Sequence, residues 1–174
     1  DCGTKSEEIY VGYERGSEWG GKIANKEGFR KDQVVAYKRT SHRVTRGFFV
    51  EGKWLNRPDD FESVFPSKPG ATVSLGITYH GREVYAVLDR SSKPPVKLIV
   101  TRDGKPIPES MRGQDVKVDE RGQTTIVIDE SRMYYVVTGE NGGLHELRFF
   151  PADAGARICS FTFGNKCQQD FDRL

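Results

Sequence analysis

Short apolar stretches separated by turn residues recur along the chain, and they predict strands rather than helices. Ten of these stretches are rich in β-branched and aromatic residues: 34–38, 47–55, 61–65, 71–79, 84–88, 96–101, 124–128, 133–137, 144–150 and 158–163. Pro, Gly, Asp and Asn cluster in the breaks between them, as turn chemistry requires. No segment sustains apolar residues at positions i, i+3, i+4 and i+7. The pattern predicts an all-β sandwich or barrel.

The last two stretches, 144–150 and 158–163, flank a short Pro/Gly/Ala turn and predict a β-hairpin. Side chains alternate along a strand, so Cys159, Phe161 and Phe163 are expected on the core face. A second reversal is expected at Asp103-Gly104, a dipeptide typical of two-residue hairpin turns.

The beginning of the chain has a weaker pattern. Residues 9–13 predict a short strand or an extended arm, and residues 17–32 predict a long surface loop because Gly, Lys, Glu and Asn dominate them. Trp54 lies within a strand and is expected in the core. Residues 1–8 are polar and indicate a linker remnant, which leaves one sandwich domain at 9–174. A chain of 174 residues supports one core and is marginal for two.

The 27 basic and 25 acidic residues are interspersed, so nothing indicates a nucleic-acid partner. The segment from Lys38 to Arg46 is the one basic-leaning stretch. It predicts a solvated loop or strand, with an anionic ligand site as the alternative. No run of about twenty apolar residues exists, so we expect no direct membrane insertion.

Three cysteines leave several pairings open. Cys159 and Cys167 flank a turn that can bring them within disulfide reach, and this pairing leaves Cys2 alone. Alternatively, Cys2 pairs with Cys167 while Cys159 stays a buried thiol, or all three remain free. Either bridge implies an oxidising, extracytoplasmic compartment.

Catalytic and metal-binding patterns are absent from the sequence. His42, His80 and His145 lie in separate segments with no metal-ligand spacing, and neither a CxxC nor a G-x-S-x-G motif occurs. We therefore expect no metal, no cofactor and no enzymatic activity. A hydrolase would need two carboxylates across a cleft, and a thiol oxidoreductase a Cys pair beside a basic group.

Aromatic and planar polar groups remain as candidate binding chemistry. Sugars bind β-sandwich modules through rings that contact their CH-rich faces and through polar groups that bond their hydroxyls. The candidate ligand-binding residues are Trp19, Tyr13, Arg15, Tyr37, Arg132 and Tyr134.

Several segments together resemble a known family. The opening Ser6 to Gly16 (SEEIYVGYERG), the strand region Gly47 to Ser63, the VTRDGKPI segment and the closing HELRFFPADAGARICSFTFG are similar to the C-terminal domain of DipZ-type thiol-disulfide proteins. That domain is a carbohydrate-binding-module-like β-sandwich, which follows a thioredoxin-like domain. The resemblance implies an antiparallel two-sheet jelly-roll sandwich of the galactose-binding kind and an extracytoplasmic location in the periplasm or cell envelope.

These observations favour a non-catalytic accessory module of a thioredoxin-like protein that recognises carbohydrate or another envelope component. The alternative is a structural domain that docks on the neighbouring redoxin domain or dimerises, with no small ligand.

Overall fold

The structure is a computed structural model that describes residues 5–18, 23–139 and 142–165. The described elements, in chain order, are β1 (Ile9–Tyr10), α1 (Tyr13–Glu18), β2 (Val34–Tyr37), β3 (Phe48–Asn56), β4 (Phe61–Ser63), β5 (Ser74–Tyr79), β6 (Glu83–Arg90), β7 (Val96–Arg102), β8 (Lys105–Pro106), the 3₁₀ turn Glu109–Met111, β9 (Lys117–Val118), β10 (Thr124–Ile128), β11 (Arg132–Val137), β12 (His145–Pro151) and β13 (Ala156–Gly164).

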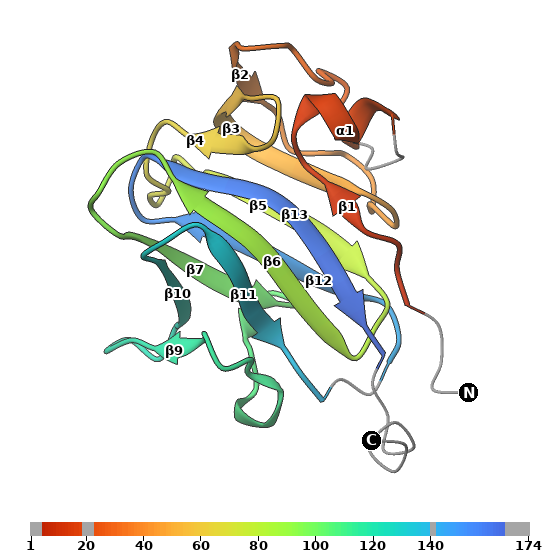
Figure 1. Cartoon of the computed structure of the whole chain (residues 1–174), viewed down its shortest axis with the longest axis vertical. Coiled ribbons are helices and arrows are strands. Elements are labelled where there is room, and N and C mark those ends of the chain that lie inside the picture. Colours follow the sequence, from red (N-terminus) through yellow and green to blue (C-terminus); the bar gives the residue numbers. More distant parts are fainter. Residues whose placement is uncertain (1–4, 19–22, 140–141, 166–174) are drawn as a thin grey trace.

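The strands form two layers, one behind the other in Figure 1. The front sheet has the order β11-β6-β13-β4-β3-β2, with β1 also paired to β13. The back sheet has the order β3-β5-β12-β7-β10-β9, with β8 beside β7. All these pairs are antiparallel. The prediction of an all-β antiparallel two-sheet sandwich is therefore confirmed.

Strand β3 belongs to both layers. Phe48 to Glu51 pair with β5 of the back sheet, whereas Gly52 and the residues after it pair with β2 and β4 of the front sheet. The change occurs at Gly52, whose φ of 86° suits glycine and strains other residues. Sandwich corners are commonly made by one strand that bends from sheet to sheet in this way.

One core fills the space between the layers. Aromatic rings meet across it: Phe149 of β12 lies 5.4 Å from Phe161 of β13, and Tyr79 of β5 stacks on Phe163 at 5.8 Å. Trp54 is fully buried, as its strand pattern predicted, and its indole N–H donates to the Glu51 carbonyl.

The closing hairpin prediction is wrong, although both of its strands exist. β12 pairs with β5 and β7 in the back sheet, whereas β13 pairs with β6, β4 and β1 in the front sheet. The turn between them crosses from one layer to the other. β12 and β13 each have one apolar face. Because the two strands lie in opposite layers, both apolar faces are buried in the core between them.

The predicted core face of β13 is confirmed for two residues and wrong for the third. Phe161 and Phe163 are buried, but the register against β6 shifts between Ile158 and Ser160, and Cys159 lies at this bulge. An extra residue changes the phase of the alternation, so Ile158 is buried in place of Cys159.

One of the connecting segments was predicted from the sequence and another was not. The reversal at Asp103-Gly104 is confirmed, since both residues have positive φ (50° and 78°) between β7 and β8. The short helix α1 was not predicted, because its six residues have no apolar period. It begins where Tyr13 and Glu14 donate backbone hydrogen bonds to the Arg57 and Pro58 carbonyls.

Candidate functional site

The outer face of the back sheet, which points away from the viewer in Figure 1, carries a row of side chains across four strands. In this row Phe49 of β3 lies opposite Gly76 of β5, Gly76 opposite Arg148 of β12, and Arg148 opposite Thr101 of β7. Leu147 and Phe149 on either side of Arg148 point into the core instead. The period-two pattern of β12 thus sends Arg148 and Phe150 outward.

Arg148 lies between two aromatic rings. Its guanidinium carbon is 5.7 Å from the ring centroid of Phe49 and 5.7 Å from that of Phe150. Phe49 is only 8% exposed and supports the guanidinium from the β3 side, whereas Phe150 is half-buried. We call these three residues the Arg148 platform. Cations within about 6 Å of an aromatic ring are attracted to its face.

Two carboxylates hold the guanidinium in place. Glu51 Oε2 lies 3.4 Å from Nη2 of Arg148, and Glu146 Oε1 lies 3.7 Å from its Nε. The Ser74 hydroxyl is a further contact at 3.4 Å. The platform is therefore a preorganised arrangement of rings, a planar donor and acceptor oxygens.

Two hollows adjoin the platform. The basic hollow, about 280 Å³, is lined by loop 39–44 together with Phe49, Glu51, Glu146 and Arg148. The Phe150 hollow, about 440 Å³, is lined by Phe150, by segments 67–69 and 151–152, and by Thr72, Ile99, Thr101 and Gln123. Both lie on the outer face of the back sheet, so they form one candidate binding surface with the platform.

The predicted residues Tyr13 and Arg15 lie together on α1, away from this surface. The Tyr13 hydroxyl donates to Asp32 (2.9 Å), and burial together with this bond raises its pKa. The Arg15 guanidinium lies 5.5 Å from the Tyr10 ring. Arg15 and Tyr10 line a separate groove of about 480 Å³ on the front sheet.

Among the other predicted ligand residues, Tyr37, Arg132 and Tyr134 are described, and none of them lines that groove. Tyr37 is a core residue, which stacks on Phe61 and donates to the Gly28 carbonyl. Tyr134 is fully buried beneath Arg132, whose guanidinium lies 3.7 Å from the ring centroid. Trp19 lies outside the described residues.

The possible disulfide partner Cys167 lies outside the described residues as well. Cys159 lines the α1 groove with Tyr10 and Arg15. Burial, with a contribution from nearby carboxylates, raises the pKa of its thiol to about 12. A thiol with such a pKa is a poor nucleophile at neutral pH.

Sequence reasoning missed the platform, although the signal was present. The signal is the alternation in HELRFFP, which separates Arg148 and Phe150 from the core residues Leu147 and Phe149. Applied to this strand, the alternation places Arg148 outward as a cation between aromatic residues. The sequence also identifies the basic segment 38–46, with an anionic ligand site as the alternative interpretation. Within the described residues, no three His, Cys, Asp or Glu side chains form a metal-binding group, and no helix is long and apolar enough to cross a membrane.

Similar proteins are found among solved structures but not among curated sequences. No curated protein matches the chain. An active-site mutant of a family two carbohydrate esterase from Clostridium thermocellum matches with a TM-score of 0.50 and 14% identity, over 68% of this chain and 31% of that one. The family two carbohydrate esterase from Cellvibrio japonicus matches with a TM-score of 0.49 and 15% identity, over 67% of this chain and 30% of that one. The chain thus spans about a third of these structures, and at this identity the first likeness shows the fold alone.

A family model covers nearly the whole domain. The model described as "Thioredoxin like C-terminal domain" matches residues 6–164, from the segment before β1 to the end of β13. The chain therefore belongs to the family of thioredoxin-like C-terminal domains.

Proposed function

We propose that this domain is a non-catalytic carbohydrate-binding module of a thioredoxin-like protein and that it binds saccharide on the outer face of the back sheet. The observation that carries the proposal is the Arg148 guanidinium held between Phe49 and Phe150 beside two hollows. Family membership supports the link to a redoxin domain. The fold is also similar to part of a carbohydrate esterase.

The chemistry of the surface suits a pyranose. The half-buried Phe150 offers an apolar face beside the Thr101 and Gln123 side chains, which can bond sugar hydroxyls. Glu51 and Arg148 add an acceptor and a planar donor at the neighbouring hollow. Glu51 and Arg148 are already held by each other, so these two side chains lose little conformational entropy when a ligand binds.

Non-catalytic action is supported by the arrangement of the carboxylates. Glu51 and Glu146 both line the basic hollow, but Arg148 pairs with each of them. A glycosidase instead needs one carboxylate as an acid and another as a base or nucleophile at the scissile bond. Incubation of the protein with saccharides that it binds should release no reducing ends.

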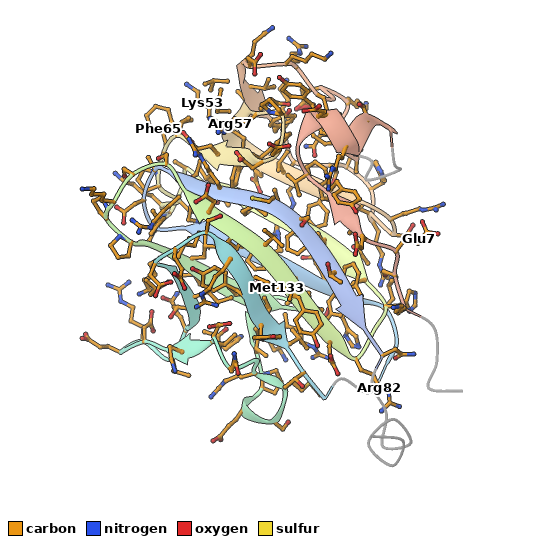
Figure 2. All side chains as sticks on the ribbon, in the orientation of Figure 1. Glu7, Lys53, Arg57, Phe65, Arg82 and Met133 are labelled. Carbon is orange, nitrogen blue, oxygen red and sulfur yellow. The ribbon has the colours of Figure 1, made fainter. Side chains whose placement is uncertain are left out.

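Calorimetry with cell-wall saccharides at millimolar concentration tests the binding proposal. Phe150→Ala should weaken binding about tenfold, because it removes the aromatic face of the site. Phe65→Ala is the matched control, since Phe65 is 54% exposed, has Lys53 over its ring at 5.4 Å (both are labelled in Figure 2) and lines neither hollow. If no saccharide binds, or if both variants bind as the wild type does, sugar recognition at this surface is ruled out.

We further propose that the parent protein is of the DipZ type and works outside the cytoplasm, in the periplasm or cell envelope. The segments that resemble the C-terminal domain of DipZ-type proteins follow one another in the same order along this chain, and this order supports the proposal. A fusion of the full-length protein to alkaline phosphatase, which matures only outside the cytoplasm, should be active. An inactive fusion that is present in normal amount would contradict it.

A second candidate function is docking on the thioredoxin-like domain of the same protein. The front sheet exposes an apolar row in which Met133 lies beside Val87, and Tyr135 beside Tyr85. Met133 and Tyr135 are 44% and 37% exposed, and Met133 projects toward the viewer in Figure 2. In the full-length protein, Met133→Glu should increase the radius of gyration measured by X-ray scattering, whereas Val118→Glu on β9 should not. An unchanged radius in both variants would contradict docking through this row.

A further inference from the structure

The loop that walls the basic hollow is held in place by buried polar contacts. Asn25, which is 5% exposed, donates to the carbonyls of Lys38 (2.9 Å) and Val50 (2.7 Å) and accepts from the Val50 N–H (2.8 Å). Further along the loop, the Thr78 hydroxyl donates to the carbonyl of the buried Val44 at 2.5 Å. The segment between these anchors, 39–43, is therefore fixed above the outer face of β3 and β5.

The fixed loop presents cations on two sides. Arg39, His42 and their neighbours line the basic hollow, and they also line an adjoining hollow of about 180 Å³ with Lys26, Glu27 and Lys38. Together the two hollows have five Lys and Arg side chains against three Glu side chains, an excess of two positive charges. The whole chain has the same excess of +2, so the rest of the protein is balanced in charge.

The acidic residues of the basic hollow already pair with a cation. Glu51 and Glu146 both pair with Arg148. In the part of the chain that the structure describes, no ion pair is formed by Arg39 or Arg43. Both arginines are exposed at the rim, where their planar guanidinium groups suit a carboxylate.

From this arrangement we infer that the ligand is an acidic saccharide, a chain of uronic acid residues whose carboxylates pair with Arg39 and Arg43 while a sugar ring contacts Phe150. This inference rests on the proposed carbohydrate-binding function and specifies its ligand. The basic hollow supplies the charge recognition, and the adjoining Phe150 hollow supplies the apolar contact. Cation-carboxylate contacts at a rim are screened by salt, so affinity should fall as ionic strength rises.

The test compares acidic saccharides with neutral counterparts that have the same backbone. The probes are polygalacturonate against its methyl ester, and polyglucuronate against cello-oligosaccharides, all measured by calorimetry or affinity electrophoresis. The wild type should bind each acidic form about tenfold more tightly than the neutral one. Arg39→Gln/Arg43→Gln should abolish this preference, because the affinity for the acidic forms should fall to that for the neutral forms.

Lys105→Gln/Lys117→Gln provides the control, because these two exposed lysines of β8 and β9 line neither loop hollow. It should retain the preference of the wild type. Equal binding of acidic and neutral forms by the wild type overturns the inference and leaves the proposed function standing. Loss of preference in both double variants assigns the effect to net charge and also overturns the inference. If the wild type binds neither form, the proposed function itself fails.

Discussion

The ring of Phe49 occupies the space where a side chain at Gly76 would stand. A Cβ at Gly76 would lie 2.3 Å from Cζ and 2.4 Å from Cε2 of Phe49, far inside van der Waals contact. The two residues are direct cross-strand neighbours on the outer face of the back sheet. Glycine on β5 therefore permits the ring that supports the Arg148 guanidinium.

Gly76→Ala should destabilise the domain by about 1–3 kcal/mol, because the new methyl group displaces a nearly buried ring. In a Phe49→Ala background the same substitution should cost much less, or stabilise by about 0.5–1 kcal/mol, since alanine suits a strand better than glycine. Urea unfolding of the four proteins gives both values. An equal cost in the two backgrounds would show that the ring is not the cause.

The bend of β3 at Gly52 predicts a second, larger effect. A Cβ there would lie 2.8 Å from the Thr72 carbonyl oxygen, and the φ of 86° adds backbone strain. Gly52→Ala should cost at least about 2–3 kcal/mol, measured by urea unfolding. Gly104→Ala is the matched control: its φ is 78°, but nothing lies within 4 Å of the added Cβ, so it should cost only about 1 kcal/mol. Similar costs at both positions would contradict a close-contact role for Gly52.

The raised pKa of Cys159 predicts a slow thiol and a stability change at alkaline pH. In a Cys2→Ser/Cys167→Ser protein, alkylation at pH 8 should be far slower in the native state than in urea. The folded pKa, about 12, exceeds the ordinary value of 9.0, so the native state holds the proton more tightly. Its contribution to stability is complete below pH 9 and declines as the pH rises toward 12.

The Cys2→Ser/Cys167→Ser protein is compared with the same protein that also carries Cys159→Ser. This comparison separates the contribution of the Cys159 thiol from that of the tyrosines, which titrate in the same range. The difference in unfolding free energy between the two proteins should shrink between pH 9 and 11. A constant difference, or rapid native alkylation at pH 8, would contradict a buried, protonated thiol.

The same residue shows how far the sequence could predict the fold. Alternation correctly predicted both terminal strands and the burial of Phe161 and Phe163, because the period of a strand is local. The bulge at Cys159 depends on the register against β6, and the separation of β12 from β13 depends on which layer each strand joins. Both are non-local choices, which a hydrophobic pattern does not encode.

The candidate site was harder to predict for a related reason. Tyr134 and Tyr37 are of a residue type that binds sugars, but both are buried. Arg148 and Phe150 come together with Phe49 only through the pairing of β5 with β3 and with β12. Residue type therefore identified the kind of chemistry, and sheet register decided which residues are exposed to carry it.

Arg132 is expected to stabilise the fold, in contrast to its predicted ligand role. Its Nη2 lies 2.9 Å from Asp115 Oδ1, and this bond raises the pKa of the guanidinium, while Asp115 Oδ2 accepts from the Tyr135 N–H. Arg132→Ala should cost about 1–2 kcal/mol, since it removes the ion pair and the contact with the Tyr134 ring. Arg132→Lys should recover less than half of this loss, because lysine has no planar group. Unchanged stability together with lost saccharide binding would instead support the ligand role.

Asn25 is expected to couple the stability of the domain to the shape of the basic hollow. Asn25→Ala leaves the Val50 N–H and two carbonyls without their partner, which should cost about 2–3 kcal/mol. Asn25→Asp keeps the acceptor for Val50 but loses both donated bonds and buries a carboxylate, so it should be at least as costly. Ser41→Ala, an exposed substitution in the same loop, should change stability by less than about 0.5 kcal/mol.

Hydrogen exchange separates a loss of loop anchoring from a general loss of stability. In Asn25→Ala, the Lys38 carbonyl loses the hydrogen bond that Asn25 donates to it. Backbone amide exchange should then increase more across residues 38–44 than in strands β6 and β13, which pair along most of their length within the front sheet. Arg39 and Arg43 lie between the Asn25 and Thr78 anchors. The Asn25→Ala protein should therefore lose its preference for acidic saccharides, while the Phe150 hollow remains intact. Uniformly faster exchange with the preference retained would show that Asn25 supports the core alone and that the loop is held by other contacts.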